Sequence, residues 1–441
     1  MIETNIQIIE DLKNFVKEAL EDRDLRRKII KNENDFTRDR KLTFENIVYF
    51  LLNISRKTLT VELKEFFEIL GKPESKCTKS AFTQQRKKLK SLFFKAWNSY
   101  LANCFYTYHT SHLWNGFRLY AIDGSTLYLP QTKELLKYFG SQKNQYGGKA
   151  MARTLFIYDV LNNIIVHSEI QPIKMSESAI LNNLISHLPD DSIAIYDRGF
   201  PSYKNMYLHM SQETEKKFVM RCSLNENNMI ANFVKSGKRN MIVNFVPPKS
   251  EAIKQLYELG YKIAKDTIIR VRLIRVELDN GEIEVLATNL YDSIKYPTSQ
   301  FKALYFMRWG VETSINYLKN IYQVELFSGY SIEAIKQDFY ATMFTFNLHS
   351  ILIKQCESNL KQTNLNKKYE YKINRTTTLG FIKGELILLF INENPEEILL
   401  KMRKEFLKEL IPIRDGRKYI RSPKIQKRGK YQTLTNYKHA V

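Results

Sequence analysis

The chain has 441 residues, of which 44% are hydrophobic and 26% charged, and this composition excludes a chain that is disordered throughout. Its 68 Lys and Arg residues outnumber the 47 Asp and Glu residues and give a net charge of +21, which favours a polyanionic partner, nucleic acid first. No apolar run approaches the roughly 20 residues of a membrane helix, and the first residues lack a secretory signal pattern.

Residues 1–112 are expected to form a helical domain, because "FENIVYFLLNI" and "LTVELKEFFEIL" repeat their apolar residues at helical spacing. The stretch "SAFTQQRKKLKSLFFKAW" then predicts a basic helix, capped by Thr78 or Ser80 and carrying Arg86, Lys87 and Lys88. Short helices followed by a basic helix favour a helix-turn-helix that binds DNA. A structural helix with a solvated basic face is the alternative.

Residues 113–210 change to an α/β pattern. The run "RLYAIDGSTLYLP" predicts a strand ending at Asp123, and "ARTLFIYDVLNNIIVHSEI" predicts a hairpin that turns near Asn162 and Asn163. A helix over "SESAILNNLISHL", capped by a Ser, precedes "DSIAIYDRGF", a buried strand that ends at Asp197. The order strand, hairpin, helix, strand predicts a mixed sheet flanked by helices, with both aspartates at one edge.

Residues 211–296 predict a β-rich insertion, with a hairpin turn at Asp279, Asn280 and Gly281. Helical spacing returns over residues 297–385, and residues 386–441 predict a helical segment and a basic tail. Between Arg414 and Lys438 this tail carries nine Lys or Arg residues and one acid. Both a phosphate-binding arm and a solvated tail fit this pattern.

The segment "YFMRWGVETSINYLKN" sets polar residues into an apolar run. When residues 301–322 are projected onto one helix, Tyr305, Arg308, Glu312 and Lys319 fall within roughly 60° of one another and form a stripe beside an apolar face. An i,i+4 surface pair between Arg308 and Glu312 is the structural alternative, although it would contribute only tenths of a kcal/mol.

The two strand-end aspartates and the helical glutamate together suggest a metal site. Asp-Gly and Asp-Arg-Gly also favour turns, so each aspartate has a structural alternative. Three carboxylates in a strongly basic chain are nevertheless the minimum needed to hold two Mg²⁺ ions over a phosphodiester, because Mg²⁺ prefers carboxylate oxygens. The surrounding Lys and Arg residues would then hold the DNA backbone.

These residues resemble the DDE transposases of bacterial insertion sequences, in the branch with a Tyr-Arg-Glu-Lys signature. The resemblance rests on "AIDGSTLYLP", "YDRGFPSY" and "YFMRWGVETSINYLK", and it covers roughly residues 36–430. It implies an RNase H-like catalytic core in which Asp123, Asp197 and Glu312 bind two Mg²⁺ ions, with Mn²⁺ as a substitute. The DNA contacts that it implies are Tyr305, Arg308 and Lys319. We also predict DNA contacts at Arg86, Lys87 and Lys88 of the basic helix and at Arg198.

The resemblance further implies a transposase that binds the terminal inverted repeats of its element and catalyses metal-dependent strand cleavage and strand transfer. It implies double-stranded DNA as the partner, a homodimer in the DNA complex, and a bacterial cytoplasmic protein that joins the nucleoid when bound to DNA. The alternatives are an inactive or repurposed copy that only binds DNA, and an RNase H-like nuclease that does not join strands.

The four cysteines fit an intracellular protein. Their spacing contains no CxxC pair and no His at zinc spacing, so we expect reduced thiols in the core; they are Cys77, Cys104, Cys222 and Cys356.

Overall fold

The computed structural model describes residues 2–38, 40–53, 57–75, 77–144, 147–224, 227–247, 250–364 and 367–414. The chain divides into two compact units. The first comprises Met1–Thr110, Leu127–Ala152 and Tyr317–Val441, and the second comprises Ser111–Thr126 and Arg153–Asn316. The predicted basic tail from Arg414 to Lys438 lies, apart from its first residue, outside the described residues.

The first unit begins with the helices expected over residues 1–112. They are α1 (Ile2–Glu18), α2 (Arg23–Ile29), α3 (Phe44–Leu52), α4 (Leu59–Ile69), α5 (Lys79–Arg86) and α6 (Leu92–Tyr108). The side chain of Thr78 caps α5 by accepting a hydrogen bond from the Ala81 N–H at 3.1 Å, which confirms one of the two predicted caps.

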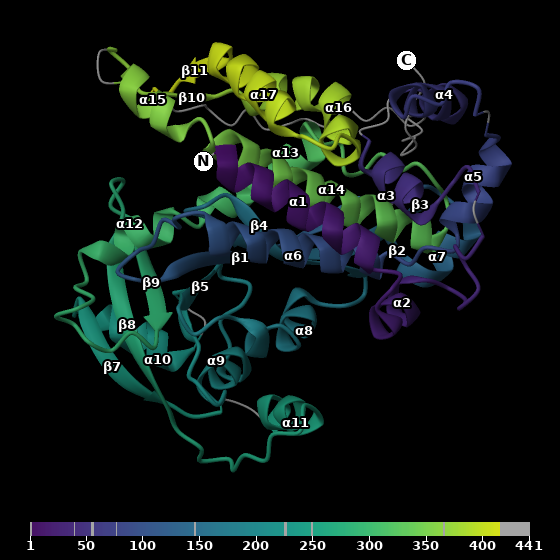
Figure 1. Cartoon of the computed structure of the whole chain (residues 1–441). Coiled ribbons are helices and arrows are strands. Elements are labelled where there is room, and N and C mark those ends of the chain that lie inside the picture. Colours follow the sequence, from purple (N-terminus) through teal and green to yellow (C-terminus); the bar gives the residue numbers. More distant parts are fainter. Residues whose placement is uncertain are drawn as a thin grey trace. The chain divides into compact units, whose positions relative to one another are not determined.

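The core of the first unit forms around α14 (Ile332–Lys354), which is buried over most of its length. Because α14 is apolar on nearly all sides, it requires helices around it. It contacts α3 and α6 (Figure 1). Trp97 of α6 stacks on Phe344 with ring centroids 3.9 Å apart. The remaining elements are α7 (Lys133–Phe139), β2 (Ser141–Asn144), α15 (Glu357–Asn364), β10 (Tyr371–Ile373), α16 (Arg375–Ile391), α17 (Glu396–Lys408) and β11 (Leu410–Pro412).

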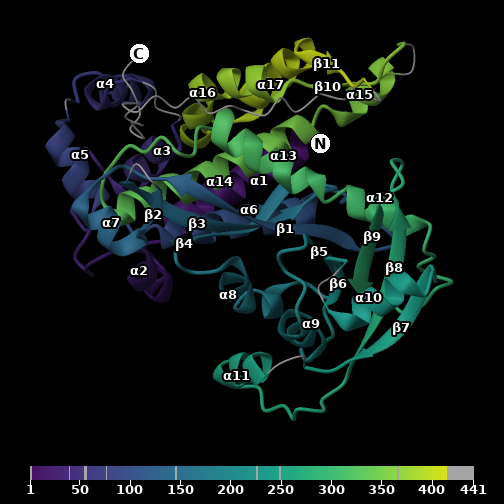
Figure 2. The ribbon, with the colours of Figure 1, turned by 180° about the vertical axis from the view of Figure 1, so that it is seen from behind.

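The second unit is built on a mixed sheet with the order β2-β3-β1-β5-β6-β9-β8-β7, in which β4 also pairs with β3 (Figure 2). Strands β1, β5 and β6 are parallel, whereas β9, β8 and β7 extend the sheet in antiparallel fashion. The bounds are β1 (Arg118–Tyr128), β3 (Gly147–Asp159), β4 (Ile164–Pro172), β5 (Ser192–Tyr196), β6 (Lys217–Cys222), β7 (Asn240–Phe245), β8 (Ile269–Glu277) and β9 (Ile283–Thr288). A hairpin strand pair beside β1, with β5 and β6 added parallel to it, is the RNase H-like arrangement that we expected.

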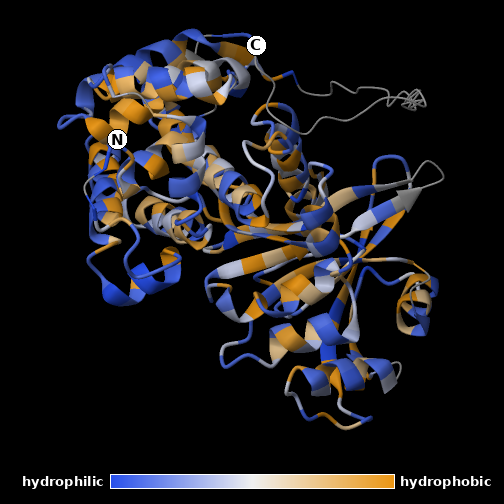
Figure 3. Ribbon diagram, turned by 90° about the vertical axis from the view of Figure 1, so that its right-hand side faces the viewer, coloured by the Kyte–Doolittle hydropathy of each residue, from blue (hydrophilic) through white to orange (hydrophobic). Residues whose placement is uncertain are grey.

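Helices cover both faces of this sheet, because alternate residues of the central strands are buried on opposite sides. Ile193 and Ile195 of β5 belong to one apolar cluster with α12 (Gln300–Phe306), while Ala194 and Tyr196 belong to the other. The second cluster receives α8 (Glu177–Asn182), α9 (Tyr203–Met210), α10 (Asn228–Lys235) and α11 (Ser250–Glu258). Hydrophobic and hydrophilic stretches alternate around the helices in Figure 3, as this layered packing requires.

The two predicted hairpins are confirmed. Asn163, with a φ of 58°, turns β3 into β4, and Gly281, with a φ of 83°, lies between β8 and β9. Both positions need the left-handed backbone region that Asn and Gly tolerate. The predicted Ser cap on α8 is also confirmed, since the Ser176 side chain accepts from the Ala179 N–H at 3.1 Å.

Two sequence-based expectations are corrected, and the strand-rich segment also contains helices that its sequence pattern did not indicate. Strand β1 does not end at Asp123 but continues to Tyr128. The single helix predicted over residues 301–322 is interrupted between Phe306 and Trp309. The segment 211–296 contains α10 and α11 besides its strands, and its first strand, β6, pairs with β5 in the central sheet. Local patterns miss these features because partner strands and packed layers decide where an element ends.

Within the described ranges, no helix is long and apolar enough to cross a membrane. The four cysteines are free thiols, and Cys104, Cys222 and Cys356 are buried, whereas Cys77 is only partly so.

Candidate active site

The two aspartates are brought together by the register of β1 and β5. These parallel strands pair Ile122 with Tyr196, the residues directly before Asp123 and Asp197. Neighbouring strands lie about 4.8 Å apart, and residues in register point to the same face. Strand β5 ends at Tyr196 while β1 continues. Asp123 therefore lies where β1 loses its parallel partner, and Asp197 begins the loop beside it.

The glutamate of the signature reaches the same unit from a helix. Glu312 lies in the first turn of α13 (Trp309–Asn320). The chain enters α13 through tight i to i−3 hydrogen bonds, in which the Arg308 N–H donates to Tyr305 O at 3.1 Å and the Gly310 N–H to Met307 O at 2.9 Å. Such a 3₁₀-like turn advances more than 100° per residue. The angles projected for one continuous helix are therefore wrong on the far side of Arg308.

Arg308 links two of the predicted acids. Its Nη2 donates to Glu312 Oε1 at 2.7 Å, and its Nη1 lies 4.0 Å from Asp123 Oδ2. The residue is only 2% exposed, and its Nε and Nη1 have no hydrogen-bond partner among the described residues. A buried guanidinium with two uncommitted donors is costly unless charges of opposite sign surround it. The acids satisfy that requirement.

Tyr305 and Arg221 hold the second aspartate. The Tyr305 hydroxyl donates to Asp197 Oδ1 at 3.1 Å, and Arg221 Nη1 of β6 lies 3.8 Å from the same oxygen. Burial raises the pKa of Tyr305, so the phenol keeps its proton and acts as a donor. The structure thus gathers Asp123, Asp197, Glu312, Tyr305 and Arg308 around one region of the second unit.

The surroundings of Asp123 disfavour the charged form of its carboxyl group. Burial raises the pKa of its carboxyl group to about 6, and the nearby carboxylates of Glu177 and Glu312 act in the same direction. The Gly124 N–H, which donates to Asp123 Oδ1 at 2.9 Å, and the Arg308 guanidinium oppose this rise. Asp123 is therefore a desolvated acid that lacks sufficient positive charge.

The acids suit a hard divalent cation in kind, since carboxylate oxygens are its preferred ligands and Asp123 lacks a compensating charge. As the described side chains stand, no three His, Cys, Asp or Glu residues are arranged so that they could hold a metal ion together. The guanidinium of Arg308 lies against Asp123 and Glu312 instead. A cation would have to compete with Arg308 for these oxygens.

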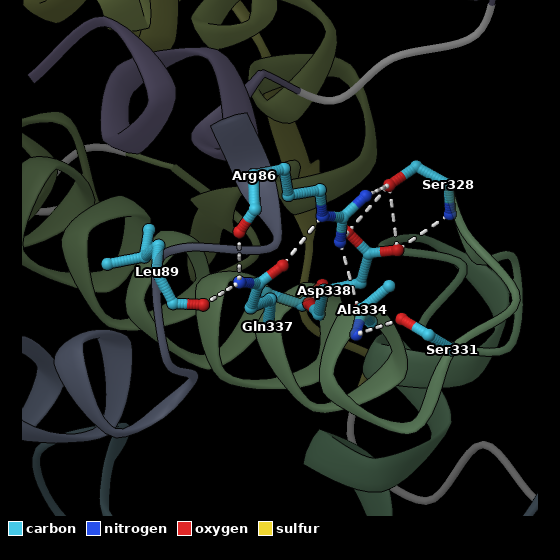
Figure 4. A network of polar contacts seen from close by, with 8 residues as sticks. Arg86, Leu89, Ser328, Ser331, Ala334, Gln337 and Asp338 are labelled. Atoms are coloured by element: carbon cyan, nitrogen blue, oxygen red, sulfur yellow. Dashed lines mark hydrogen bonds and ion pairs between the residues drawn. The ribbon is translucent and has the colours of Figure 1, made fainter. Parts of the chain in front are cut away.

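Arg86 lies in a buried network within the first unit (Figure 4). It is 4% exposed, and its Nη2 pairs with Asp338 at 2.8 Å and bonds Ala334 O at 2.9 Å. Its Nε and Nη1 donate to Gln337 and Ser328, both at 2.6 Å. All three nitrogens are committed, so we interpret Arg86 as a structural residue. This corrects the sequence-based assignment of Arg86 to DNA.

The other predicted DNA contacts lie at different depths. Lys87 and Arg198 are exposed. Lys88 is partly buried, and its Nζ lies 3.7 Å from Asp35 Oδ1. Lys319 lies in the last turn of α13, in the part of the helix that belongs to the first unit, whereas Tyr305 and Arg308 belong to the second. The predicted stripe is thus divided between the two units.

Sequence reasoning did not single out Glu177, Arg153 or Arg221. Glu177 lies near Asp123 and Arg221 near Asp197 only because of the sheet and the helix beside it, and Arg153 pairs with Glu177. Glu177 lies at the start of the helix predicted over "SESAILNNLISHL", and nothing in its spacing indicates that it lies near Asp123. The only local signal is Gly124, which directly follows the predicted strand end at Asp123.

Three comparisons relate this chain to known proteins. The family model described as "Transposase DDE domain" matches residues 114–348, more than half of the chain. The chain is 27% identical over 106 residues to "Putative transposase InsZ" of Escherichia coli (strain K12), a match that covers 23% of this chain and 34%, about a third, of that protein. A cryo-EM structure of a piggyBac transposase synaptic complex with hairpin DNA aligns over 91% of this chain and 82% of that one, with 11% identity and a TM-score of 0.41.

Proposed function

Since the chain belongs to the family defined by the transposase DDE domain, we propose that it cleaves and joins DNA strands at the ends of its own insertion sequence. Asp123, Asp197 and Glu312 would form the catalytic centre. Water would first cut a strand to expose a 3′-hydroxyl group, and that hydroxyl would then attack a second strand. No covalent link to the protein is required.

One observation carries this proposal. The pairing of Ile122 with Tyr196 brings Asp123 of β1 next to Asp197, which directly follows β5. Arg308 Nη1 lies 4.0 Å from Asp123 Oδ2, and its Nη2 lies 2.7 Å from Glu312 Oε1. Three acids that lie 74 and 115 residues apart in sequence thereby share one region. A surface ion pair between Arg308 and Glu312 would not need a buried arginine or a second acid, so the structural alternative explains less.

We propose Mg²⁺ as the cofactor, with Asp123, Asp197 and Glu312 holding two ions and Mn²⁺ as a substitute. When bound, the ions would supply Lewis-acid stabilisation of charge on the phosphodiester oxygens. The desolvated Asp123 supports this assignment, because an acid short of positive charge gains most from a cation. Arg308 neutralises part of the same charge before a cation arrives.

Tyr305 and Arg308 would orient the acids and also contact the DNA backbone. Tyr305 fixes the carboxylate of Asp197, and Arg308 fixes that of Glu312. The Nε and Nη1 donors of Arg308 are buried without hydrogen-bond partners among the described residues, and they would suit a phosphate oxygen once DNA binding exposes them. Lys319 and Arg198 are proposed as further phosphate contacts.

DNA binding by the first unit is supported by a groove of about 990 Å³ within it. Its lining includes the basic residues Lys31, Lys79, Lys87 and Lys90. Lysines on such a surface neutralise phosphates and release condensed counterions. We propose that this surface, with Lys88 beside it, binds the terminal inverted repeats, and that two copies of the chain bridge the two ends.

The proposal is tested with a labelled duplex that carries one end of the element. The wild-type protein should nick it only when Mg²⁺ or Mn²⁺ is present, and Asp123→Asn should bind the duplex equally well but lose at least a hundredfold in cleavage rate. Asp190→Asn is the control, because Asp190 is an exposed acid paired with Lys216. Cleavage by Asp123→Asn at the wild-type rate would refute the assignment.

The same assay separates the alternatives. Joined products in addition to nicks indicate transposition, whereas nicks alone indicate a nuclease. Binding of the duplex by the wild-type protein without any metal-dependent cleavage would indicate an inactive or repurposed copy.

A further inference from the structure

Glu177 is an acid beside the proposed catalytic centre that the mechanism above does not use. It is the first residue of α8, on the sheet face opposite to α12. Its side chain is 29% exposed, and its Oε1 accepts from Arg153 Nη1 at 3.0 Å. A negative charge in the first turn of a helix is favourable in any protein, and this is the structural explanation to be weighed.

The position of Glu177 is more specific than a helix start requires. Its carboxyl group lies directly over Gly124, where a Cβ atom would fall 2.1 Å from Glu177 Cδ and 2.3 Å from Oε1. Real Cβ atoms do not approach other atoms so closely. Gly124 has no left-handed backbone conformation that would explain a glycine there. The glycine therefore leaves space for the glutamate.

This space brings a fourth acid to Asp123. Because Asp123 and Gly124 are consecutive in β1, their side-chain directions point to opposite faces of the sheet. Glu312 approaches Asp123 from α13, whereas Glu177 approaches from the α8 side. Glu177 thus adds a negative charge next to Asp123 from the sheet face opposite to Glu312.

A second observation concerns the two arginines beside these acids. Arg308 is 2% exposed and extends into it, yet its Nη1 is 4.0 Å from the Asp123 carboxylate and has no hydrogen-bond partner among the described side chains. Arg153 Nε, on the Glu177 side, is likewise buried without one. Because Arg308 Nη1 is too far from Asp123 for a hydrogen bond, the negative charge of the acids is only partly compensated, and a cation can still neutralise it.

We infer that Glu177, seated in the space left by Gly124, is a positioning residue that strengthens the binding of a divalent cation at Asp123. Its negative charge lowers the energy of a cation beside Asp123, and Arg153 keeps its carboxylate in place. The inference rests on the proposed function, because it requires Asp123 to be a metal ligand. It explains why the residue after Asp123 is glycine.

The test uses the full chain and Mn²⁺ as the probe, with bound ion measured by electron paramagnetic resonance. Glu177→Gln should weaken Mn²⁺ binding about tenfold, the lower end of the loss seen when outer partners of a metal site are removed. Gly124→Ala should weaken it by a similar factor, because the added methyl group displaces the glutamate. The double variant should bind Mn²⁺ no more weakly than the weaker-binding single variant. Both changes remove the same interaction, that of Glu177 with the cation, so their effects should not add.

Glu215→Gln is the matched control. Glu215 pairs with Lys217 at 2.9 Å, and its side chain is 33% exposed, close to the 29% of Glu177. It should bind Mn²⁺ like the wild-type protein. Thermal unfolding of all variants shows whether they are folded, and Glu177→Asp, which keeps the charge, serves as a second variant that should retain most of the affinity.

The outcomes separate the two proposals. Wild-type affinity in Glu177→Gln, or losses that multiply in the double variant, would overturn the inference about Glu177 while leaving the metal site intact. Equal Mn²⁺ binding by the wild-type protein and Asp123→Asn would overturn the metal site itself, and the inference about Glu177 with it.

Discussion

Replacing Arg308 by Met is the most direct test of how the acids are held in the absence of metal. Met fills a similar volume but removes the positive charge that lies 2.7 Å from Glu312 and 4.0 Å from Asp123. Breaking a buried ion pair in this way costs about 3 to 5 kcal/mol, because the acids are left without a partner.

The expected loss lies at the low end of that range. The side chain of Glu312 is 36% exposed and that of Asp123 is 22% exposed, so water screens part of the charge that remains. We expect about 3 kcal/mol. For a unit of this size, that loss lowers the midpoint of thermal unfolding by about 6 to 12 °C.

Mg²⁺ should reverse part of this loss. The variant leaves the acids free of Arg308, so a cation that binds only the folded protein should raise its unfolding midpoint by more than it raises that of the wild-type protein. Differential scanning calorimetry with and without about 10 mM Mg²⁺ measures both the loss in the unfolding midpoint and its recovery.

Arg118→Met serves as the control, because Arg118 pairs at 3.2 Å with Asp191, whose side chain is 51% exposed. A surface pair of this kind contributes about 1 kcal/mol or less. If Arg308→Met lowered the midpoint no more than Arg118→Met, or if Mg²⁺ stabilised the variant and the wild-type protein equally, the proposed balance between Arg308 and the metal would be wrong.

The remaining predictions concern one pair of neighbours and one buried histidine. Arg86→Met should destabilise the first unit by about 3 to 5 kcal/mol, because it leaves Asp338 buried without its partner. Lys87→Ala should leave thermal unfolding unchanged and reduce the salt dependence of DNA binding by about one counterion. The opposite pattern would reverse the two roles. Burial lowers the pKa of His209 to about 3, so its stabilising effect is complete above its unfolded pKa near 6.5 and is lost as the pH falls below that value. Between pH 7 and pH 5 this residue should account for a loss of about 2 kcal/mol in the free energy of unfolding. His209→Gln, which can still bond the Tyr196 hydroxyl, should therefore show a shallower pH dependence in urea unfolding, and an unchanged slope would argue against a neutral buried histidine.

Helices, hairpins and caps were predictable because they depend on short-range spacing. The helical apolar spacing around Phe50 and Phe66 and the side-chain oxygens of Thr78 and Ser176 act within a few residues, and the structure confirms each element. The turn at Asn163 follows from the backbone angles that few residues accept.

The sequence alone also indicated the acids of the candidate site. Strand ends with aspartate, a helical glutamate and a large positive charge suggested metal and phosphate chemistry before any contact was known. The polar spacing of residues 305–319 pointed to one helix face, but it could not reveal the tight turn at Arg308, because 100° per residue holds only inside a regular α-helix.

Only the tertiary structure decided which charged residues share a space. Arg86 and Lys87 are adjacent in sequence and equally basic, yet packing against α14 buries the first and leaves the second exposed. Glu177 reaches Asp123 because a helix packs over β1 and Gly124 has no side chain. Sequence determines which groups are available through local spacing, whereas strand register and layer packing join residues far apart in the chain, and only that joining determines which charges meet.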